Sequence, residues 1–252
     1  MIKTGLLSIT FRKLEADEIV RLTAKAGLDA IEWGGDIHVP HGNLEKAAEV
    51  GAMTRDAGIE TASYGSYFYA GEKEGTVPAE HVVETAVALG APTIRIWAGR
   101  RGSDKADADY RHAVVEETRK IADLAAERGM TIDFEYHRNT LTDTLDSTLL
   151  LLKEVNRPNV RSNWQPPVDL THEERLSGLK AVAPYLANVH VFHWNVTERR
   201  PLAEGETDWR TYLAAVRQTG RTHYAMLEFV KGDDPDQFLQ DAETLVRLVR
   251  SE

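Results

Sequence analysis

The sequence predicts a closed (β/α)8 barrel that forms one domain over residues 1–252. The chain alternates eight times between short apolar or β-branched runs and longer stretches of helical periodicity. Each pair takes roughly 30 residues, the usual size of one βα unit in such a barrel. The rival fold, an open doubly wound sheet, usually begins with a glycine-rich turn, whereas the first turn here reads Thr10-Phe11-Arg12-Lys13. We therefore expect a barrel without a nucleotide cofactor.

The first four βα units occupy the N-terminal half of the chain. We expect strands at residues 4–9, 30–33, 59–64 and 93–97, and helices at residues 15–26, 44–57, 79–89 and 107–128. Each helix is followed directly by a glycine, namely Gly27, Gly58, Gly90 and Gly129. Glycine readily adopts the left-handed conformation that ends many helices, so these glycines support the predicted helix ends.

The second half repeats the pattern. We expect strands at residues 131–135, 160–164, 189–192 and 224–229, and helices at residues 141–155, 171–182 and 208–218. Thr171 and Glu174 have the spacing of a capping box, in which each side chain bonds a free backbone amide at the helix start. A last helix follows Asp234-Pro235, which is an N-cap followed by a proline in the first turn.

The composition excludes several function classes. Hydrophobic residues make up 42% of the chain, cysteine is absent, and the net charge is −10. Without cysteine there is no disulfide framework, zinc finger or thiol nucleophile. A strongly acidic chain repels nucleic acid, and no apolar run approaches the roughly 18 residues that span a membrane. We expect a cytoplasmic small-molecule enzyme with no membrane or nucleic-acid partner, and a homo-oligomer remains open.

Polar residues at the ends of predicted strands are informative, because buried parallel strands are otherwise apolar. Four of them, Glu135, Asn163, His190 and Glu228, end or lie in four successive strands. Chemistry in these barrels gathers at the C-terminal strand ends, so we expect the four side chains to bind one divalent cation. Oxygen ligands with a single imidazole suit Mn²⁺, Mg²⁺ or Co²⁺. A single Glu or His at a strand end more often has a structural role. Four such residues at matching positions on successive strands favour a metal site.

Aromatic and polar residues crowd the same strand ends and predict a concave pocket for a sugar-like ligand. The predicted substrate-binding residues are Trp33, His38, Trp97, His137, Gln165, His193 and Arg199. Core packing or a loop hydrogen bond would explain any one of them equally well. Arg199 could bind an anion. The loop after the last strand, however, contains Asp233-Asp234, whose negative charges would repel phosphate. We therefore expect a substrate without phosphate.

The chain also resembles a known family in several short motifs. These are Ala30-Ile31-Glu32-Trp33, Phe134-Glu135, Val189-His190-Val191, Leu227-Glu228-Phe229, and the loop from Arg199-Arg200-Pro201 to Thr207-Asp208-Trp209. Together they are similar to the xylose-isomerase-like TIM barrels, in particular the sugar phosphate isomerase/epimerase group that includes D-tagatose 3-epimerase-like enzymes. The resemblance implies that Glu135, His190 and Glu228 bind the metal and that the two glutamates form the base/acid pair. The family usually has Asp where this chain has Asn163, which removes one negative charge from the ligand set.

These observations favour a metal-dependent isomerase or epimerase, with Mn²⁺ as the preferred ion, acting on a non-phosphorylated sugar or keto-polyol. Glu135 or Glu228 would remove the proton next to the carbonyl to give a metal-bound enediolate, and the other would return it. A lyase or dehydratase that expels a substituent from the same enediolate is the first alternative. The second is a barrel that binds a sugar without catalysis, because Asn163 would weaken metal binding.

Overall fold

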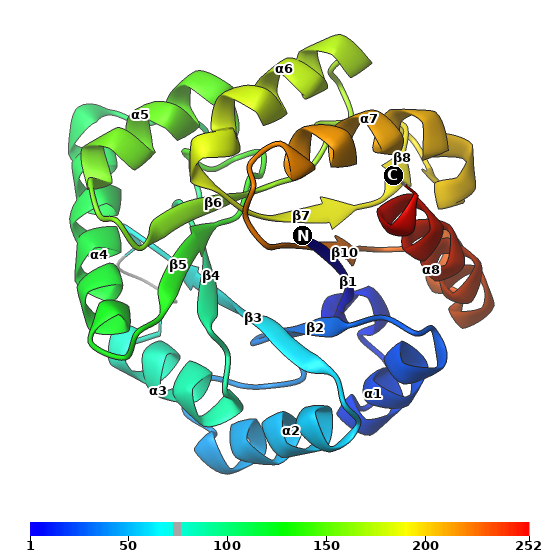
Figure 1. Ribbon diagram of the computed structural model, residues 1–252. Coiled ribbons are helices and arrows are strands. Elements are labelled where there is room, and N and C mark those ends of the chain that lie inside the picture. Colours follow the sequence, from blue (N-terminus) through cyan, green and yellow to red (C-terminus); the bar gives the residue numbers. More distant parts are fainter. Residues whose placement is uncertain (73–76, 252) are drawn as a thin grey trace.

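The computed structural model describes residues 1–72 and 77–251 and contains a closed barrel of eight parallel strands (Figure 1). The barrel strands are β1 (Ile2–Leu7), β2 (Ala30–Gly34), β3 (Glu60–Tyr69), β4 (Thr93–Trp97), β5 (Thr131–Phe134), β6 (Val160–Trp164), β7 (Leu186–Val191) and β10 (His223–Leu227). Each strand pairs with its neighbour in the chain, and β1 pairs with β10 to close the ring. The predicted (β/α)8 fold is confirmed.

Eight α-helices surround the barrel, as Figure 1 shows. They are α1 (Ala16–Lys25), α2 (Leu44–Asp56), α3 (Ala79–Leu89), α4 (Ala108–Ala126), α5 (Leu145–Val155), α6 (His172–Val182), α7 (Glu206–Arg217) and α8 (Pro235–Arg250). The predicted capping box is present, because Thr171 and Glu174 bond each other's backbone amides. Gly90 ends α3 in the left-handed conformation. Helix α5 starts four residues later than predicted because Thr144 caps it by accepting from the Ser147 amide.

The largest departures from the predicted elements lie in the loops at the C-terminal ends of strands. Strand β1 ends at Leu7 and passes into a 3-10 turn, η1 (Ser8–Phe11). After β7, the strands β8 (His193–Trp194) and β9 (Arg199–Arg200) form a small antiparallel hairpin that the sequence pattern did not predict. Three further 3-10 turns are η2 (Ala183–Tyr185), η3 (Leu202–Gly205) and η4 (Lys231–Asp233). A strand of two residues is too short to show periodicity, so this hairpin carries no signal in the sequence.

Alternation along the strands decides which side chains reach the barrel interior. In β2, Trp33 points outward, where it is fully buried and donates from Nε1 to Thr54 Oγ1 of α2 at 3.2 Å. Its neighbour Glu32 therefore points inward. Apolar side chains such as Ala30, Ala62 and Met226 pack together in a separate cluster. None of the helices in residues 1–72 and 77–251 is both long and apolar enough to cross a membrane.

Asp133 is a buried acid on β5, two residues before Glu135 and on the same face of the strand. Burial raises the pKa of Asp133 to about 7, although the nearby Arg161 acts in the opposite direction. In the unfolded chain the same carboxyl titrates near its ordinary value of about 3.9. The unfolded state therefore loses this proton first as the pH rises, and Asp133 destabilises the fold progressively between about pH 4 and pH 7.

Replacing this acid should remove that pH dependence. In the variant Asp133→Asn we expect the free energy of unfolding, relative to the unmodified chain, to rise by on the order of 2–4 kcal/mol between pH 4 and pH 8. Urea unfolding of both proteins in the presence of a chelator, at a series of pH values, measures the difference. Parallel profiles across this range would show that Asp133 is already ionised in the folded protein.

Candidate active site

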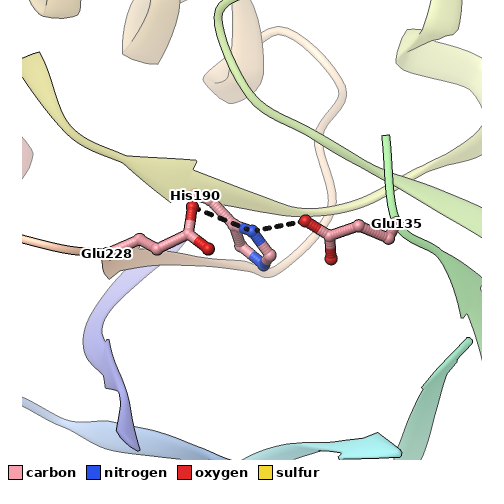
Figure 2. A group of neighbouring side chains, drawn as sticks. All are labelled: Glu135, His190 and Glu228. Atoms are coloured by element: carbon pink, nitrogen blue, oxygen red, sulfur yellow. Dashed lines mark ion pairs between the residues drawn. The ribbon is translucent and has the colours of Figure 1, made fainter. Parts of the chain in front are cut away.

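Three of the predicted ligands meet at the C-terminal end of the barrel. Glu135 directly follows β5, His190 lies in β7, and Glu228 directly follows β10. His190 Nδ1 lies 3.4 Å from Glu135 Oε1 and 3.7 Å from Glu228 Oε2, as Figure 2 shows. One potential ligand atom from each residue falls within 4.8 Å of the other two, and all three residues are buried.

Backbone hydrogen bonds hold both glutamates in place directly after the last residues of their strands. The Glu135 amide donates to the Ile96 carbonyl at 2.9 Å, and the Glu228 amide donates to the Val191 carbonyl at 3.0 Å. The chain then turns sharply at Phe229, whose φ of 48° lies in the left-handed region. The Phe229 amide donates to Thr10 Oγ1 at 3.1 Å, which ties this turn to the first βα loop. Such a conformation is strained for a large residue and often marks a functional site.

The group formed by Glu135, His190 and Glu228 fits a divalent cation. In the part of the chain that the structure describes, His190 Nδ1 is a buried atom without a hydrogen bond, although two carboxylates face it. Buried polar atoms are nearly always bonded, so an unpaired nitrogen between two carboxylates needs an explanation. Carboxylate oxygens with one imidazole nitrogen form a common ligand set for divalent metals. These residues could therefore bind a divalent metal.

Asn163, the fourth predicted ligand, lies on the opposite side of the His190 ring. Its Nδ2 is 3.4 Å from His190 Nε2, and its Oδ1 accepts from the Asn188 amide at 3.3 Å. The pairing of β6 with β7 shifts register between Ser162 and Trp164, next to this residue. Asn163 thus contacts the Nε2 side of the ring, whereas Nδ1 faces the two glutamates, and its oxygen accepts from the backbone.

Two charged residues that the sequence analysis did not place among the site residues complete the cluster. Arg95 Nε lies 2.7 Å from Glu32 Oε1, and Arg95 Nη1 lies 2.9 Å from Glu135 Oε2. The side chains of Arg95 and Glu32 are only 2% and 1% exposed. Both residues interrupt otherwise apolar strands, as Ile31-Glu32-Trp33 and Ile94-Arg95-Ile96, and this was the available signal.

Burial and charge give Glu135, His190 and Glu228 different proton affinities. Burial alone would raise the pKa of Glu135, but Arg95 and His190 lower it below its ordinary value. Burial raises the pKa of Glu228, and the charge of Glu135 adds to this effect, although His190 opposes it. Burial would lower the pKa of His190, but the surrounding glutamates raise it well above its ordinary value. Of the two glutamates, Glu228 therefore has the higher pKa, about 7, whereas the pKa of Glu135 lies below its ordinary value.

A cavity of about 310 Å³ opens beside Glu228. Its wall includes Tyr136, His137, Gln165, Phe192 and Trp194. Gln165 Nε2 donates to the Tyr136 carbonyl at 2.6 Å and lies 3.3 Å from Glu135 Oε1. His137 and Gln165, two predicted substrate-binding residues, therefore border the cavity.

His137 and Trp97 stand together at the rim of this region. His137 Nδ1 donates to the Arg138 carbonyl at 2.7 Å, which leaves Nε2 as an acceptor. The Trp97 ring packs edge-on against the His137 ring at 4.8 Å and stacks on the Tyr69 ring at 5.5 Å. Within the described residues the indole nitrogen of Trp97 is buried and has no hydrogen-bond partner.

The structure places the other predicted substrate-binding residues elsewhere. Trp33 lies under α2, outside the barrel wall. The ring nitrogens of His38 lie 2.9 Å from Ser8 Oγ and 3.1 Å from the Leu14 carbonyl, so both are already used. Side chains alternate between the two faces of a strand. Because Glu32 on β2 points into the barrel, the next residue, Trp33, points outward.

His193 and Arg199 belong to the β8–β9 hairpin. The His193 ring packs so closely on Gly205 that a Cβ at this glycine would meet Nδ1 at 2.4 Å. Arg199 lies over the Phe229 ring at 4.7 Å and pairs with Asp233 at 2.5 Å. Both residues therefore build the loop beside the cavity and do not line its wall.

Comparison with known proteins agrees with this architecture. The chain is 35% identical to a 3-dehydroshikimate dehydratase of Bacillus anthracis over 157 residues, which cover 54% of this chain and 55% of that protein. The match thus spans about half the length of that relative. A crystal structure of a probable 3-DHS dehydratase of Bacillus anthracis, involved in petrobactin synthesis, has 25% identity and a TM-score of 0.80, covering 98% of this chain and 99% of that one.

Sugar epimerases have the same fold at lower identity. A D-allulose 3-epimerase of Methylomonas sp. shows 17% identity and a TM-score of 0.75, covering 98% of this chain and 97% of that one. The relatives named here are enzymes, as expected for this chain. The family model described as the xylose isomerase-like TIM barrel matches residues 20–248. Because this match covers nearly the whole chain, the protein belongs to the xylose isomerase-like TIM barrel family.

Proposed function

We propose that this protein is a divalent-metal-dependent lyase that removes water from a cyclic hydroxy ketone acid of the 3-dehydroshikimate type. One observation carries the choice of a lyase: Arg95 binds Glu135, while Glu228 borders the cavity. A two-base epimerisation needs both carboxylates to exchange protons with the substrate, whereas elimination requires one. The similarity to dehydratases at 35% and 25% identity supports the same choice. This ranks the lyase above the epimerase, which the sequence analysis placed first.

Glu135, His190 and Glu228 would hold the cation. When bound, the ion would polarise the substrate carbonyl and lower the pKa of the neighbouring C–H group. Mn²⁺ is the ion we propose, with Mg²⁺ or Co²⁺ as substitutes, because all three accept oxygen ligands with one imidazole.

Glu228 would accept the proton from the carbon next to the carbonyl. The hydroxyl on the following carbon would then leave with that proton as water, so that one C–H bond and one C–O bond break and a C=C bond forms. Glu228 suits this task because it borders the cavity, whereas the other carboxylate, Glu135, is paired with Arg95. In 3-dehydroshikimate, enolisation after the loss of water makes the ring aromatic, which drives the reaction forward.

The cavity wall supports an anionic ring as the substrate. Arg138 lines the cavity, and its planar guanidinium can form a two-point pair with a carboxylate. Phe192 and Trp194 supply aromatic surface, with ring centroids 4.1 Å apart in a stacked arrangement. Asp143 and Asp169 also border the cavity and disfavour a phosphate, which is larger and more highly charged.

Metal binding should stabilise the protein through His190. At a Mn²⁺ concentration of about 100 times Kd we expect a gain of about 2.7 kcal/mol, or a rise in Tm of about 5–10 °C. The variant His190→Gln should lose this increment in differential scanning calorimetry. His223→Gln is the matched control, because His223 is equally buried and hydrogen-bonded at the start of β10. Equal increments in both variants would exclude His190 as a ligand.

The mass of the product shows which reaction the protein catalyses. With Mn²⁺ and 3-dehydroshikimate we expect a product that is lighter by one water, and no product after chelation. A panel of ketoses in D₂O tests the epimerase alternative, which predicts products of unchanged chemical formula that carry deuterium. Deuterated ketose without any dehydration would contradict the proposed lyase.

Glu228 should be needed for proton transfer at saturating metal. We expect Glu228→Gln to lower kcat by about 10²–10⁴-fold, the usual contribution of a positioned acid or base. The comparison variant is Asp143→Asn, because Asp143 lines the same cavity and its Oδ2 accepts from the Ser103 amide. This variant should keep kcat within a few-fold of the unmodified enzyme. A parallel Mn²⁺ titration of each variant sets the metal concentration used in the assay. Equal losses of kcat in the two variants would show that Glu228 is not the group that transfers the proton.

A further inference from the structure

We infer that Glu32 is a positioning residue for the metal centre: it fixes the His190 ring from the side opposite the cation and holds Arg95 against Glu135. This inference rests on the proposed metal site, but it does not depend on which reaction the site performs. Glu32 lies on β2, and its side chain is only 1% exposed.

The first contact of Glu32 is with Arg95. Its Oε1 lies 2.7 Å from Arg95 Nε, and the same guanidinium reaches Glu135 Oε2 with Nη1 at 2.9 Å. Arg95 therefore bridges two carboxylates, one of which is a proposed ligand. Gly65 of β3 makes room for this bridge, because a Cβ there would meet Arg95 Nη2 at 2.5 Å and Glu32 Oε1 at 2.9 Å. A side chain at this position would therefore displace one of the two groups.

The second contact of Glu32 is with His190. Glu32 Oε2 accepts a hydrogen bond from Ser63 Oγ and faces His190 Nε2 at 3.9 Å. A histidine that binds a metal through Nδ1 carries its proton on Nε2, and such rings are usually oriented by a carboxylate near that N–H. Because both side chains are almost completely buried, solvent does not screen this charge contact. Asn163 Nδ2 lies 3.4 Å from the same nitrogen, Nε2, but an amide NH2 is a donor and cannot accept its proton. Glu32 is therefore the acceptor that favours the form of His190 whose Nδ1 is free to bind the ion.

A purely structural explanation is that Glu32 neutralises the buried Arg95, since an unpaired buried charge is strongly destabilising. The two explanations differ when both charges are removed. The double variant Glu32→Gln/Arg95→Gln keeps the net charge of the site, so neutralisation is no longer needed. If Glu32 orients His190, however, this variant still lacks the carboxylate beside Nε2.

The test is a calorimetric titration of the metal-free protein with Mn²⁺, without substrate. The set comprises the unmodified chain, Glu32→Gln, the double variant and Asp241→Asn. Asp241 is the matched control, because it is a buried carboxylate on α8 that accepts from the Leu202 amide outside the barrel. Melting curves show which variants fold. If Glu32→Gln does not fold, the titration of the double variant decides the test.

We expect the Kd for Mn²⁺ to rise about 10–100-fold in Glu32→Gln and at least tenfold in the double variant, as for other residues that orient a metal ligand. Asp241→Asn should bind like the unmodified chain. A Kd in the double variant within threefold of the unmodified chain would overturn the inference and leave the metal site intact. Failure of the unmodified chain to bind Mn²⁺ would instead overturn the metal site itself.

Discussion

The burial of several charged side chains at one end of the barrel is the constraint on which the rest of the site depends. Glu32, Arg95, Glu135, His190 and Glu228 are all nearly inaccessible to water. Charges in such a place must be paired, because the loss of hydration costs several kcal/mol for each ion. The Glu32–Arg95 pair is neutral by itself, so Glu135 and Glu228 leave two negative charges that a divalent cation would balance. Burial raises the pKa of Glu228, with Glu135 adding to the effect, and the surrounding glutamates raise the pKa of His190.

Arg95 makes the two carboxylates unequal, and this inequality links the electrostatics to the proposed chemistry. Glu135 is held in its ionised form by a guanidinium at 2.9 Å, whereas Glu228 borders the cavity. A site with one mobile proton suits an elimination, in which a single group can accept the proton and release it to the leaving water. The fold alone does not decide this point, since dehydratases and epimerases share the same barrel.

The fold and the central group of two glutamates and one histidine could be predicted because they follow from local patterns. Strand periodicity and the βα repeat placed Glu135, His190 and Glu228 at neighbouring strand ends, and the structure brings them together. The salt bridge between Arg95 and Glu32 joins residues 63 positions apart, so only the closed barrel reveals it.

The surroundings of other predicted site residues were harder to foresee. Asn163 occupies a strand where the register shifts, which pattern arguments do not detect. The sequence alone could have excluded Trp33 as a substrate-binding residue. It directly follows Glu32, which points inward, so it must point to the other side of the strand.

The most direct test of this account is a crystal structure of the protein grown with Mn²⁺, with anomalous diffraction recorded at the manganese absorption edge. The account predicts one strong anomalous peak within bonding distance of Glu135, His190 Nδ1 and Glu228, with Arg95 still paired to Glu32. A peak coordinated by other side chains, or no peak at the barrel mouth at saturating Mn²⁺, would contradict it.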